Sequence, residues 1–408
     1  MRILFVSPHF PPDISALARR VHELGKQWSA AGHEVHVLCG LPGHPTGELP
    51  ARYRGRLYFH ERVDGIDVHR TWTYVTPNAR IVRRSIAFAS YAASALTVGQ
   101  LQLPQPDVIV ASSPQFFAAV AGVVMGWVRQ VPVVVEIRDL WPQSVWEVGA
   151  ISRNHPAIAF LEHLEHLVYR TADRIVVVAE PFRDHILACA PERSRADIEV
   201  ITNGADLRRF HPAVEGEGMR AELGISSQEP VALYAGTHGM AHGLETVVDA
   251  ARLLPNVSFV FVGEGARKEA VRDHAEGLQN VRFHAPIDGD RMPALYAAAD
   301  VCLVPLRDLD VFQTVIPSKL FEIWGLAKPV VLGVRGEAAR IVAEAGGGVV
   351  VRPEDPRALA TAIDSLVTDP DRAAALGRAG RRRVEQRYDR SKLAQRYLDL
   401  LAEVAGAT

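Results

Sequence analysis

Short apolar runs alternate with amphipathic runs along the chain, and this alternation limits the possible folds more than any other feature. Apolar runs of strand length lie at 3–6, 35–38, 108–110, 133–136 and 175–178. Helical segments such as Leu17–Ala30 and Phe116–Arg129 lie between several of them. Continuously apolar strands with helices between them are typical of a parallel sheet that is covered on both faces. The first half of the chain is therefore predicted to be a doubly wound α/β domain.

The same pattern restarts in the second half of the chain. Strand-like runs lie at 231–234, 257–262, 281–284, 301–304, 330–332 and 348–351, again with helical runs between them. The segment from Asn203 to Gly218 contains Asn-Gly, proline and further glycines, which indicates turns and a linker. We predict two doubly wound parallel-sheet (Rossmann-like) domains, 1–205 and 206–386, that face each other across a cleft. A last helical segment, 387–408, is expected to cross back to the first domain. In such sheets ligands bind at the carboxyl ends of the strands.

Charge and composition exclude several classes of protein. Lys and Arg number 45 and Asp and Glu 47, so the formal net charge is −2 and no global positive field favours nucleic acid. The three cysteines lie far apart, which fits a reducing compartment and neither a disulfide framework nor a zinc site. Met1-Arg2 leads directly into the apolar run 3–6, so no signal peptide is expected. The protein is predicted to be cytoplasmic.

Two loops of the first domain carry candidate functional residues after predicted strands. Ser7–Asp13 is rich in proline and leads into a helix that Ser15 could cap, a pattern that is more often structural than functional. In the loop Glu136–Ser144, charged residues and Trp141 follow a buried strand directly, as at a ligand-facing rim. A surface ion pair between Arg138 and Asp139 is an equally good interpretation of these charges.

A glycine-rich loop opens the second domain. In the segment Ala235–Glu245, glycines allow the backbone to approach a ligand closely, and the following helix offers unpaired N–H groups. We expect a phosphate cradle here. The spacing is not the dinucleotide fingerprint, and the spacing around Gly263-Glu264-Gly265 is not either.

The segment Val315–Glu322 carries the most specific signal. Pro317 and Ser318 favour a helix start, and Lys319 adds a positive charge that suits a diphosphate. Glu322 lies three residues further on, on the same helix face, where its carboxylate could accept two hydrogen bonds from a vicinal diol such as a ribose. The alternative is an ion pair of Lys319 and Glu322 on the surface.

Short motifs of both halves together form a pattern specific to one family. They are Phe10-Pro11-Pro12-Asp13, Arg20–Leu24, Gly32–Val35, Leu41–Gly47, Arg138–Ser144, Asn203–Asp206, Tyr234–Gly236, His242–Glu245, Val262–Gly265 and Pro317–Glu322. With these motifs nearly the whole chain resembles retaining glycosyltransferases of family 4, which have the GT-B fold. It is most similar to bacterial enzymes that assemble O-antigen, capsule and colanic-acid-type polysaccharides.

The resemblance implies an enzyme with a nucleotide-sugar donor, carrying UDP or GDP, that the second domain holds. Glu322 would bind the ribose, and Lys319 and backbone N–H groups would bind the diphosphate. The donor residues that it implies are Gly236, Thr237, Gly239, Gly263, Gly265, Arg267, Pro286, Ile316, Ser318, Lys319 and Glu322. A carbohydrate, lipid-linked or small-molecule acceptor would contact Asp13, His44, Ser113, Arg138, Asp139 and Trp141. The expected catalytic residues are Lys319, Glu322, Asp139 and His238.

The chain departs from the family pattern in three places. Many members have Glu at the position of Thr314, Lys at that of His242, and a Gly-Gly pair where this chain has Asp13-Ile14-Ser15. Lys319, His238 and Arg267 must therefore supply more of the positive charge.

The resemblance implies front-face attack, in which the leaving phosphate oxygen accepts the acceptor's proton. Helix dipoles and Lys319 would stabilise the leaving group without a metal ion or cofactor. Closure of the cleft would exclude water and limit hydrolysis of the donor.

Two side-chain patterns could hold a metal ion, but each has a simpler interpretation. Asp308-Leu309-Asp310 spells the D-x-D that holds a cation in other glycosyltransferases, yet here it lies in a loop of the diphosphate-binding domain. His163 and His166 lie beside Glu162 and Glu165, but on an amphipathic helix such residues are more often solvated.

Arg80, Arg83 and Arg84 precede the uncharged run Ser85–Leu103. This combination could rest on an anionic membrane surface at the inner face of the membrane. A buried helix with a basic start explains it equally well.

Two other functions fit the same donor site. A sugar-nucleotide epimerase with the GT-B fold would release a changed donor, and a non-catalytic binding protein would leave the donor unchanged. Incubation with the donor alone separates both from a transferase, which hydrolyses the donor slowly.

Overall fold

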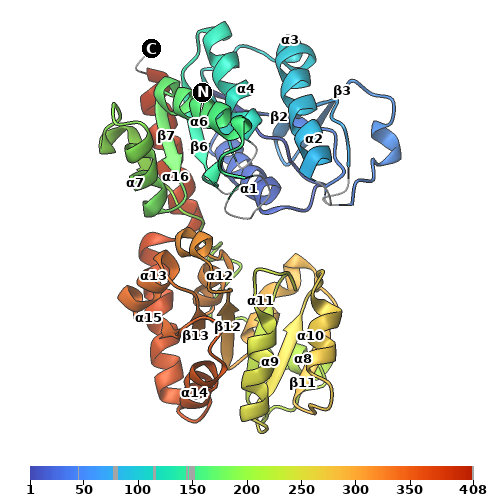
Figure 1. Cartoon of the computed structure of the whole chain (residues 1–408), viewed down its shortest axis with the longest axis vertical. Coiled ribbons are helices and arrows are strands. Elements are labelled where there is room, and N and C mark those ends of the chain that lie inside the picture. The colour runs from blue at the N-terminus through green and yellow to red at the C-terminus, as the bar shows by residue number, and fades with distance from the viewer. Residues whose placement is uncertain (45, 77–80, 114–115, 144–145, 147–151, 407–408) are drawn as a thin grey trace. The chain divides into compact units, whose positions relative to one another are not determined.

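The computed structural model describes residues 1–44, 46–76, 81–113, 116–143, 146 and 152–406, with only the backbone for 81, 82 and 84. The chain forms two compact units (Figure 1), Met1–Thr202 together with Ala394–Thr408, and Asn203–Leu393. The sequence placed these boundaries after residues 205 and 386. Among residues singled out above, Pro45, Arg80 and Ser144 lie outside the described residues, as does the side chain of Arg84.

The first unit contains an eight-stranded sheet in the order β3-β4-β2-β1-β5-β6-β7-β8. All neighbouring strands are parallel except β3 and β4, which are antiparallel. The strands are β1 (Arg2–Val6), β2 (Glu34–Gly40), β3 (Tyr58–Val63), β4 (Ile66–Thr71), β5 (Val108–Ser112), β6 (Val133–Ile137), β7 (Arg174–Val177) and β8 (Ile198–Val200). β1 has β2 on one side and β5 on the other, so the strand order reverses there.

The hairpin of β3 and β4 departs from the fully parallel sheet that the apolar runs predict. Its turn consists of Asp64 and Gly65, with φ of 50° and 84°. Two consecutive residues with positive φ form the turn that matches the twist of antiparallel strands. β3 lies at the sheet edge and alternates exposed with half-buried residues, so it lacks the apolar run of a central strand.

The helices of the first unit begin with α1, whose expected cap is confirmed because Ser15 Oγ accepts a hydrogen bond of 3.0 Å from the Ala18 N–H. The helical segments are α1 (Ala16–Ala30), η1 (Ala51–Tyr53), α2 (Ile81–Ser94), η2 (Ala95–Gly99), α3 (Gln100–Gln102), α4 (Phe116–Arg129), α6 (Pro156–Thr171), α7 (Glu180–Cys189) and η3 (Arg195–Asp197). In the described part of the chain, no helix combines the length and hydropathy that a membrane span needs.

The second unit contains a six-stranded parallel sheet in the order β11-β10-β9-β12-β13-β14. Its strands are β9 (Val231–Ala235), β10 (Ser258–Val262), β11 (Val281–His284), β12 (Val301–Pro305), β13 (Val330–Gly333) and β14 (Gly348–Val350). Its helical segments are α8 (Glu217–Glu222), α9 (Leu244–Leu253), α10 (Lys268–His274), η4 (Gly289–Arg291), α11 (Met292–Ala297), η5 (Asp310–Thr314), α12 (Lys319–Gly325), α13 (Glu337–Ala345), α14 (Pro356–Val367) and α15 (Pro370–Arg387).

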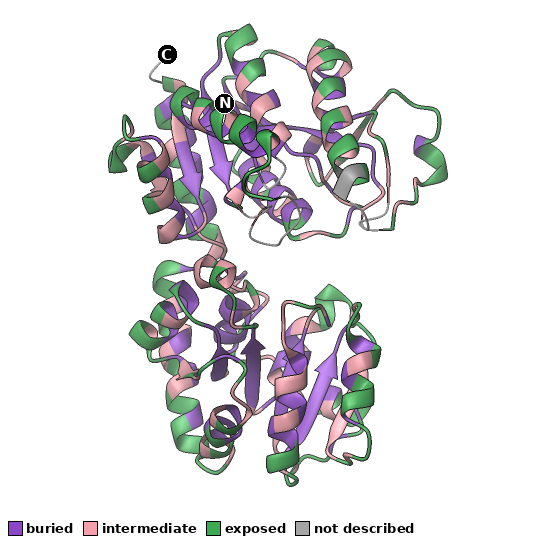
Figure 2. Ribbon diagram, viewed as in Figure 1, coloured by how far each residue is buried: buried purple, intermediate pink, exposed green. Residues whose placement is uncertain are grey.

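Both faces of this sheet are buried, and Figure 2 shows the central strands in the buried class. Along β9, Val231, Leu233 and Ala235 belong to one apolar cluster, while Ala232 and Tyr234 belong to a cluster on the opposite face. Alternate residues of a strand point to opposite faces, so a strand covered on both sides is apolar throughout. This confirms the doubly wound α/β class for the second unit.

The last helix, α16 (Arg390–Gly406), starts in the second unit and continues from Ala394 as part of the first. The indole N–H of Trp28 in α1 donates to the Ala394 carbonyl at 3.0 Å. The ring of Trp28 meets the ring of Tyr397 edge-on, with centroids 5.4 Å apart. The C-terminal residues are therefore part of the core of the first unit.

Candidate active site

The strand order of the second unit reverses between β9 and β12, two neighbouring strands at the centre of the sheet. Ligands of open α/β sheets bind at the carboxyl ends of the strands where the order reverses. Ala235 is the last residue of β9, and Lys319 begins α12, which follows β12 and η5. Lys319 Nζ donates to the Ala235 carbonyl oxygen at 2.8 Å. This contact brings the loops after β9 and β12 together at the reversal point.

The ammonium of Lys319 lies in a confined environment. It is 4.3 Å from the ring centroid of Tyr234, and the residue is half-buried. Burial lowers the pKa of Lys319 to about 8, against the opposing effect of the Glu322 carboxylate. A lysine in this state is still charged at neutral pH, and incomplete hydration strengthens its attraction for an anion.

α12 places Lys319 and Glu322 three residues apart, hence on one side of the helix. The helix is anchored by buried apolar side chains, among them Leu320, Phe321 and Trp324. Glu322 itself is only 9% exposed. The N–H groups of Leu320 and Phe321 donate to the carbonyls of Pro317 and Ser318 at 3.0 and 3.2 Å. The predicted helix start at the Pro-Ser pair is therefore confirmed.

The glycine-rich loop after β9 packs against the loop after β10. Gly236 N–H donates to Val262 O at 2.9 Å, and His238 N–H donates to Glu264 O at 2.8 Å. A Cβ on Gly263 would lie 1.9 Å from the Gly236 carbonyl oxygen, and one on Gly265 would lie 2.4 Å from the His238 oxygen. The close contact between the two loops therefore leaves no room for a side chain at Gly263 or Gly265.

The expectation that His238 adds positive charge is wrong, while the expected role of Arg267 stays a prediction. His238 is fully buried next to the rings of Tyr234, Phe261 and Phe283, and burial lowers its pKa to about 4, so the ring is neutral at neutral pH. The Arg267 guanidinium forms an ion pair with Glu245.

The other expected donor residues surround the same loops. Thr237, Pro286 and Ser318 are exposed, while Gly239 and Ile316 are half-buried. Thr237 O accepts a hydrogen bond of 2.6 Å from the Tyr234 hydroxyl, which fixes the glycine-rich loop.

The D-x-D segment lies beside an arginine. Arg335 Nη2 lies 2.5 Å from Asp308 Oδ1 and 3.7 Å from Asp310 Oδ1. Both carboxylates therefore face a guanidinium, which opposes binding of a cation at the same place.

In the first unit Asp13 connects two loops. Its Oδ1 accepts hydrogen bonds from the N–H groups of Gly43 and His44, each 2.8 Å long, and its Oδ2 lies 3.1 Å from His9 Nδ1. Asp13 is buried. Its carboxylate therefore positions the loop after β2, and the ring of His44 lies against the ring of His9 at 4.7 Å.

The loop after β6 carries the remaining expected acceptor residues. Ser113 Oγ accepts a 3.4 Å hydrogen bond from the Arg138 N–H, and Asp139 is exposed. Among the described residues, Nε and Nη1 of Arg138 have no hydrogen-bond partner. Trp141 stacks on Phe116, with centroids 5.9 Å apart and planes at 8°.

Sequence reasoning did not identify three features of the first unit. One is a buried ion pair of Arg20 with Glu136, and another is a cavity of about 300 Å³ lined in part by Leu41, Trp72 and Tyr74. The signal for the cavity was the aromatic pair Trp72 and Tyr74, which follows β4.

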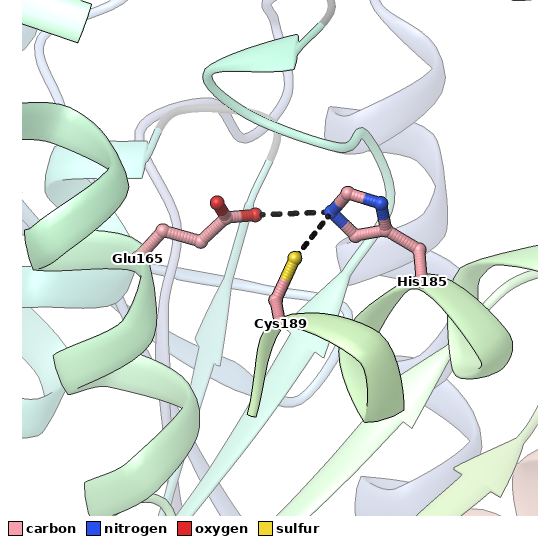
Figure 3. A group of neighbouring side chains, drawn as sticks. All are labelled: Glu165, His185 and Cys189. Carbon is pink, nitrogen blue, oxygen red and sulfur yellow. Dashed lines mark hydrogen bonds and ion pairs between the residues drawn. The ribbon is translucent and has the colours of Figure 1, made fainter. Parts of the chain in front are cut away.

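The third feature is a cluster of Glu165, His185 and Cys189, whose side chains point toward one another (Figure 3). The sequence had paired Glu165 with His163 and His166. In the structure His163 is exposed, and His166 Nδ1 instead lies 3.0 Å from the Cys189 carbonyl oxygen.

Comparison with known proteins identifies both halves of the chain. Residues 15–204 match the glycosyl transferase 4-like domain, and residues 217–383 match the glycosyl transferases group 1 domain. The chain is 24% identical over 393 residues to the putative colanic acid biosynthesis glycosyl transferase WcaI of Escherichia coli, which covers 91% of this chain and 93% of that protein.

Solved structures share the fold of the whole chain. Sucrose-phosphate synthase from Thermosynechococcus elongatus gives a TM-score of 0.74 at 21% identity, with 100% of both chains covered. Anabaena Alr3699/HepE in complex with UDP gives 0.72 at 18% identity, covering 99% of this chain and 100% of that one. These neighbours confirm the GT-B fold. The chain belongs to the family 4 glycosyltransferases, with a glycosyl transferase 4-like domain followed by a group 1 domain, and is an enzyme.

Proposed function

We propose that the protein transfers a sugar, with retention of anomeric configuration, from a nucleoside-diphosphate sugar to a hydroxyl of an acceptor in polysaccharide or glycoconjugate synthesis. The observation that carries the proposal is the position of Lys319. Its ammonium lies beside Ala235 at the reversal point of the second sheet, where α/β sheets bind ligands.

The second unit binds the donor in this proposal. Arg267 and Lys268 pair with Glu245 and Glu264, whereas the Lys319 ammonium donates to a neutral carbonyl, so Lys319 is the cation best placed for the diphosphate. Backbone N–H groups of the glycine-rich loop and of the start of α12 assist it. Glu322, one turn into α12, accepts hydrogen bonds from the ribose hydroxyls.

Catalysis follows from the charge that develops on the leaving group. Cleavage of the bond between sugar and phosphate leaves negative charge on the nucleoside diphosphate, and a cation held ready in a confined site stabilises it. The leaving phosphate oxygen accepts the proton of the acceptor hydroxyl as that hydroxyl attacks from the same face. The proposed transfer needs no metal ion, which agrees with the pairing of Asp308 and Asp310 with Arg335.

The first unit binds the acceptor in this proposal. Asp139 is exposed in the loop after β6, whereas Nε and Nη1 of the neighbouring Arg138 are buried, without a hydrogen-bond partner among the described residues. Trp72 and Tyr74 line a cavity of about 300 Å³, and aromatic faces of this kind suit the apolar side of a sugar ring. A lipid-linked acceptor would bring the protein to the inner face of the membrane, with Arg83, which is exposed, toward anionic headgroups.

Thermal unfolding with UDP, GDP, ADP and their glucose or mannose conjugates tests the donor site, because a ligand that binds only the native state raises the melting temperature. HepE, whose structure contains UDP, makes uridine the first nucleotide to examine. A shift with a nucleoside diphosphate that is much smaller in Glu322→Ala supports the proposal. No shift with any of them contradicts it.

Donor-only incubation then distinguishes the reactions. Slow hydrolysis supports a transferase, an isomeric donor indicates an epimerase, and an unchanged donor indicates a binding protein. Retention is read from the anomeric coupling constant of the first product formed. An inverted anomeric centre would contradict the proposed front-face attack.

The membrane contact has its own test. Co-sedimentation with anionic liposomes should be weaker for Arg83→Glu than for the unchanged protein. Equal binding contradicts a membrane role for this segment.

A further inference from the structure

We propose that Glu165, His185 and Cys189 in the first unit form a binding site for a thiophilic divalent cation, with Zn²⁺ as the best match. His185 Nε2 lies 3.3 Å from Cys189 Sγ and 3.5 Å from Glu165 Oε1. The three ligand atoms all lie within 4.8 Å of one another (Figure 3). Glu165 comes from α6, and His185 and Cys189 come from one side of α7, four residues apart.

The two distances from His185 fit tetrahedral coordination, and the third, between Glu165 and Cys189, is at most 4.8 Å. Zinc binds nitrogen and oxygen at about 2.0–2.2 Å and sulfur at about 2.3 Å, so neighbouring ligand atoms of a tetrahedral site lie about 3.3–3.6 Å apart. Both separations measured from His185 agree with this range. The combination of thiolate, imidazole and carboxylate favours zinc over magnesium or calcium, which prefer oxygen ligands.

One ring nitrogen faces both neighbours, and this distinguishes the cluster from a catalytic triad. In a triad the nucleophile and the acid contact different nitrogens of the imidazole. Here Cys189 and Glu165 both approach Nε2 of His185. A cation between the three atoms would be coordinated by all of them. The alternative is that the Nε2–H of His185 is shared between Cys189 Sγ and Glu165 Oε1.

The surroundings resemble a supported metal site. The Tyr169 hydroxyl donates to Glu165 Oε1 at 2.8 Å, and His166 Nδ1 lies 3.0 Å from the Cys189 carbonyl, at the end of α7. Such outer contacts orient the ligands of metal sites. The side chain of His185 is 24% exposed, so solvent reaches the cluster and a water molecule can supply the fourth ligand. A bound cation would link α6, which precedes β7 in the sequence, to α7, which follows it.

Zinc binding to the full chain tests the site directly. Purified protein that has been treated with a chelator should take up one Zn²⁺ per chain in competition with a colorimetric chelator. Cys189→Ser and His185→Ala should weaken Zn²⁺ binding by more than about 100-fold, because loss of an outer contact alone costs about 10- to 100-fold. Tyr169→Phe, which removes such an outer contact, should fall in that lower range.

His163→Ala is the matched control, since His163 is an exposed histidine on the same helix. It should leave the zinc affinity unchanged. Equal loss in His163→Ala and in Cys189→Ser would show adventitious surface binding and overturn the proposal, as would uptake of less than one Zn²⁺ per chain by the unchanged protein.

Cobalt gives a readout that does not depend on any variant folding. Co²⁺ bound to the unchanged protein should show a thiolate charge-transfer band and the intense visible bands of tetrahedral coordination. A spectrum with weak octahedral bands only, or without the thiolate band, contradicts the site. Zinc should also raise the melting temperature of the unchanged protein and not that of Cys189→Ser.

Discussion

Arg20 and Glu136 form a buried ion pair in the first unit, with Arg20 Nε 2.8 Å from Glu136 Oε1. Ser112 Oγ also donates to the Glu136 carboxylate, at 2.8 Å, and the other nitrogens of Arg20 donate to the carbonyls of Ile201 and Thr202. Burial alone would raise the pKa of Glu136, but Arg20 and Arg138 more than offset it and hold the pKa below its usual value. Through these bonds Arg20 and Glu136 connect α1 and β6 to residues 201 and 202, which follow β8.

Removing one partner of this pair should destabilise the first unit strongly. Arg20→Met leaves the Glu136 carboxylate buried without its main counter-charge, and we expect a loss of about 3–5 kcal/mol in the free energy of unfolding. Chemical denaturation measures it. Arg174→Met breaks the exposed pair with Glu403 and should cost less than about 1 kcal/mol. Equal effects of the two substitutions would contradict the importance of burial.

Replacement of Lys319 by Ala should slow turnover more than it weakens donor binding. The ammonium acts mainly on charge that develops as the donor bond breaks, so kcat should fall by about 100- to 1,000-fold. The donor dissociation constant, measured by calorimetry, should rise far less. A large rise in that constant with unchanged kcat would show that Lys319 serves only for binding.

The lowered pKa of Lys319 predicts a pH dependence. The charged form is the active one, so kcat/KM should be constant well below pH 8, reach half of its maximum near pH 8 and fall further above it. In Lys319→Arg the guanidinium stays protonated, so any remaining activity should not show this fall. The same decline in both proteins would assign it to another group.

Glu322→Ala should weaken binding of the nucleoside diphosphate. Loss of two charge-assisted hydrogen bonds to the ribose costs about 2–3 kcal/mol, or about 30- to 150-fold in the dissociation constant. The 2′,3′-dideoxynucleotide should bind the unchanged protein and the variant almost equally, since it lacks the hydroxyls. If the variant binds the ribonucleotide with unaltered affinity, the ribose assignment is wrong.

Gly263→Ala should damage the donor loops. The added Cβ would meet the Gly236 oxygen at 1.9 Å, and φ of Gly263 is 147°, so we expect about 2–4 kcal/mol of destabilisation. Gly218→Ala is the control, because no atom lies within 4 Å of the Cβ that this substitution adds. Alanine in helix α8 should stabilise by about 0.5–1 kcal/mol. Denaturation of both variants, followed by nucleotide titration, separates loop damage from general instability.

Much of the fold follows from local patterns. The strands whose residues are apolar on both faces were predicted close to their observed bounds, for example β9 (Val231–Ala235) and β10 (Ser258–Val262). β3 and β4 were not predicted: β3 lies at the edge and one of its faces remains polar, and β4 beside it carries Asp67, His69 and Arg70 among its apolar residues. β8 was not predicted because Glu199 interrupts its short sequence, so it shows no continuous apolar run.

The candidate site was predictable only where it depends on local sequence. The start of α12 follows from Pro317 and Ser318, which precede it directly. The charge on His238 could not be predicted, since it depends on burial against Phe261 and Phe283 from other strands. The grouping of Glu165 with His185 and Cys189 depends on how two helices pack, which residue spacing along either helix does not reveal.

The contacts of Trp28 with Ala394 and Tyr397 have a consequence for synthesis of the protein on the ribosome. The N-terminal unit includes residues from Ala394 on, which are translated after the entire second unit. These two contacts in its interior therefore form only after the second unit has been translated. A chain truncated before α16 would lack the contacts of the Trp28 indole with Ala394 and Tyr397, as the growing chain does before these residues are made.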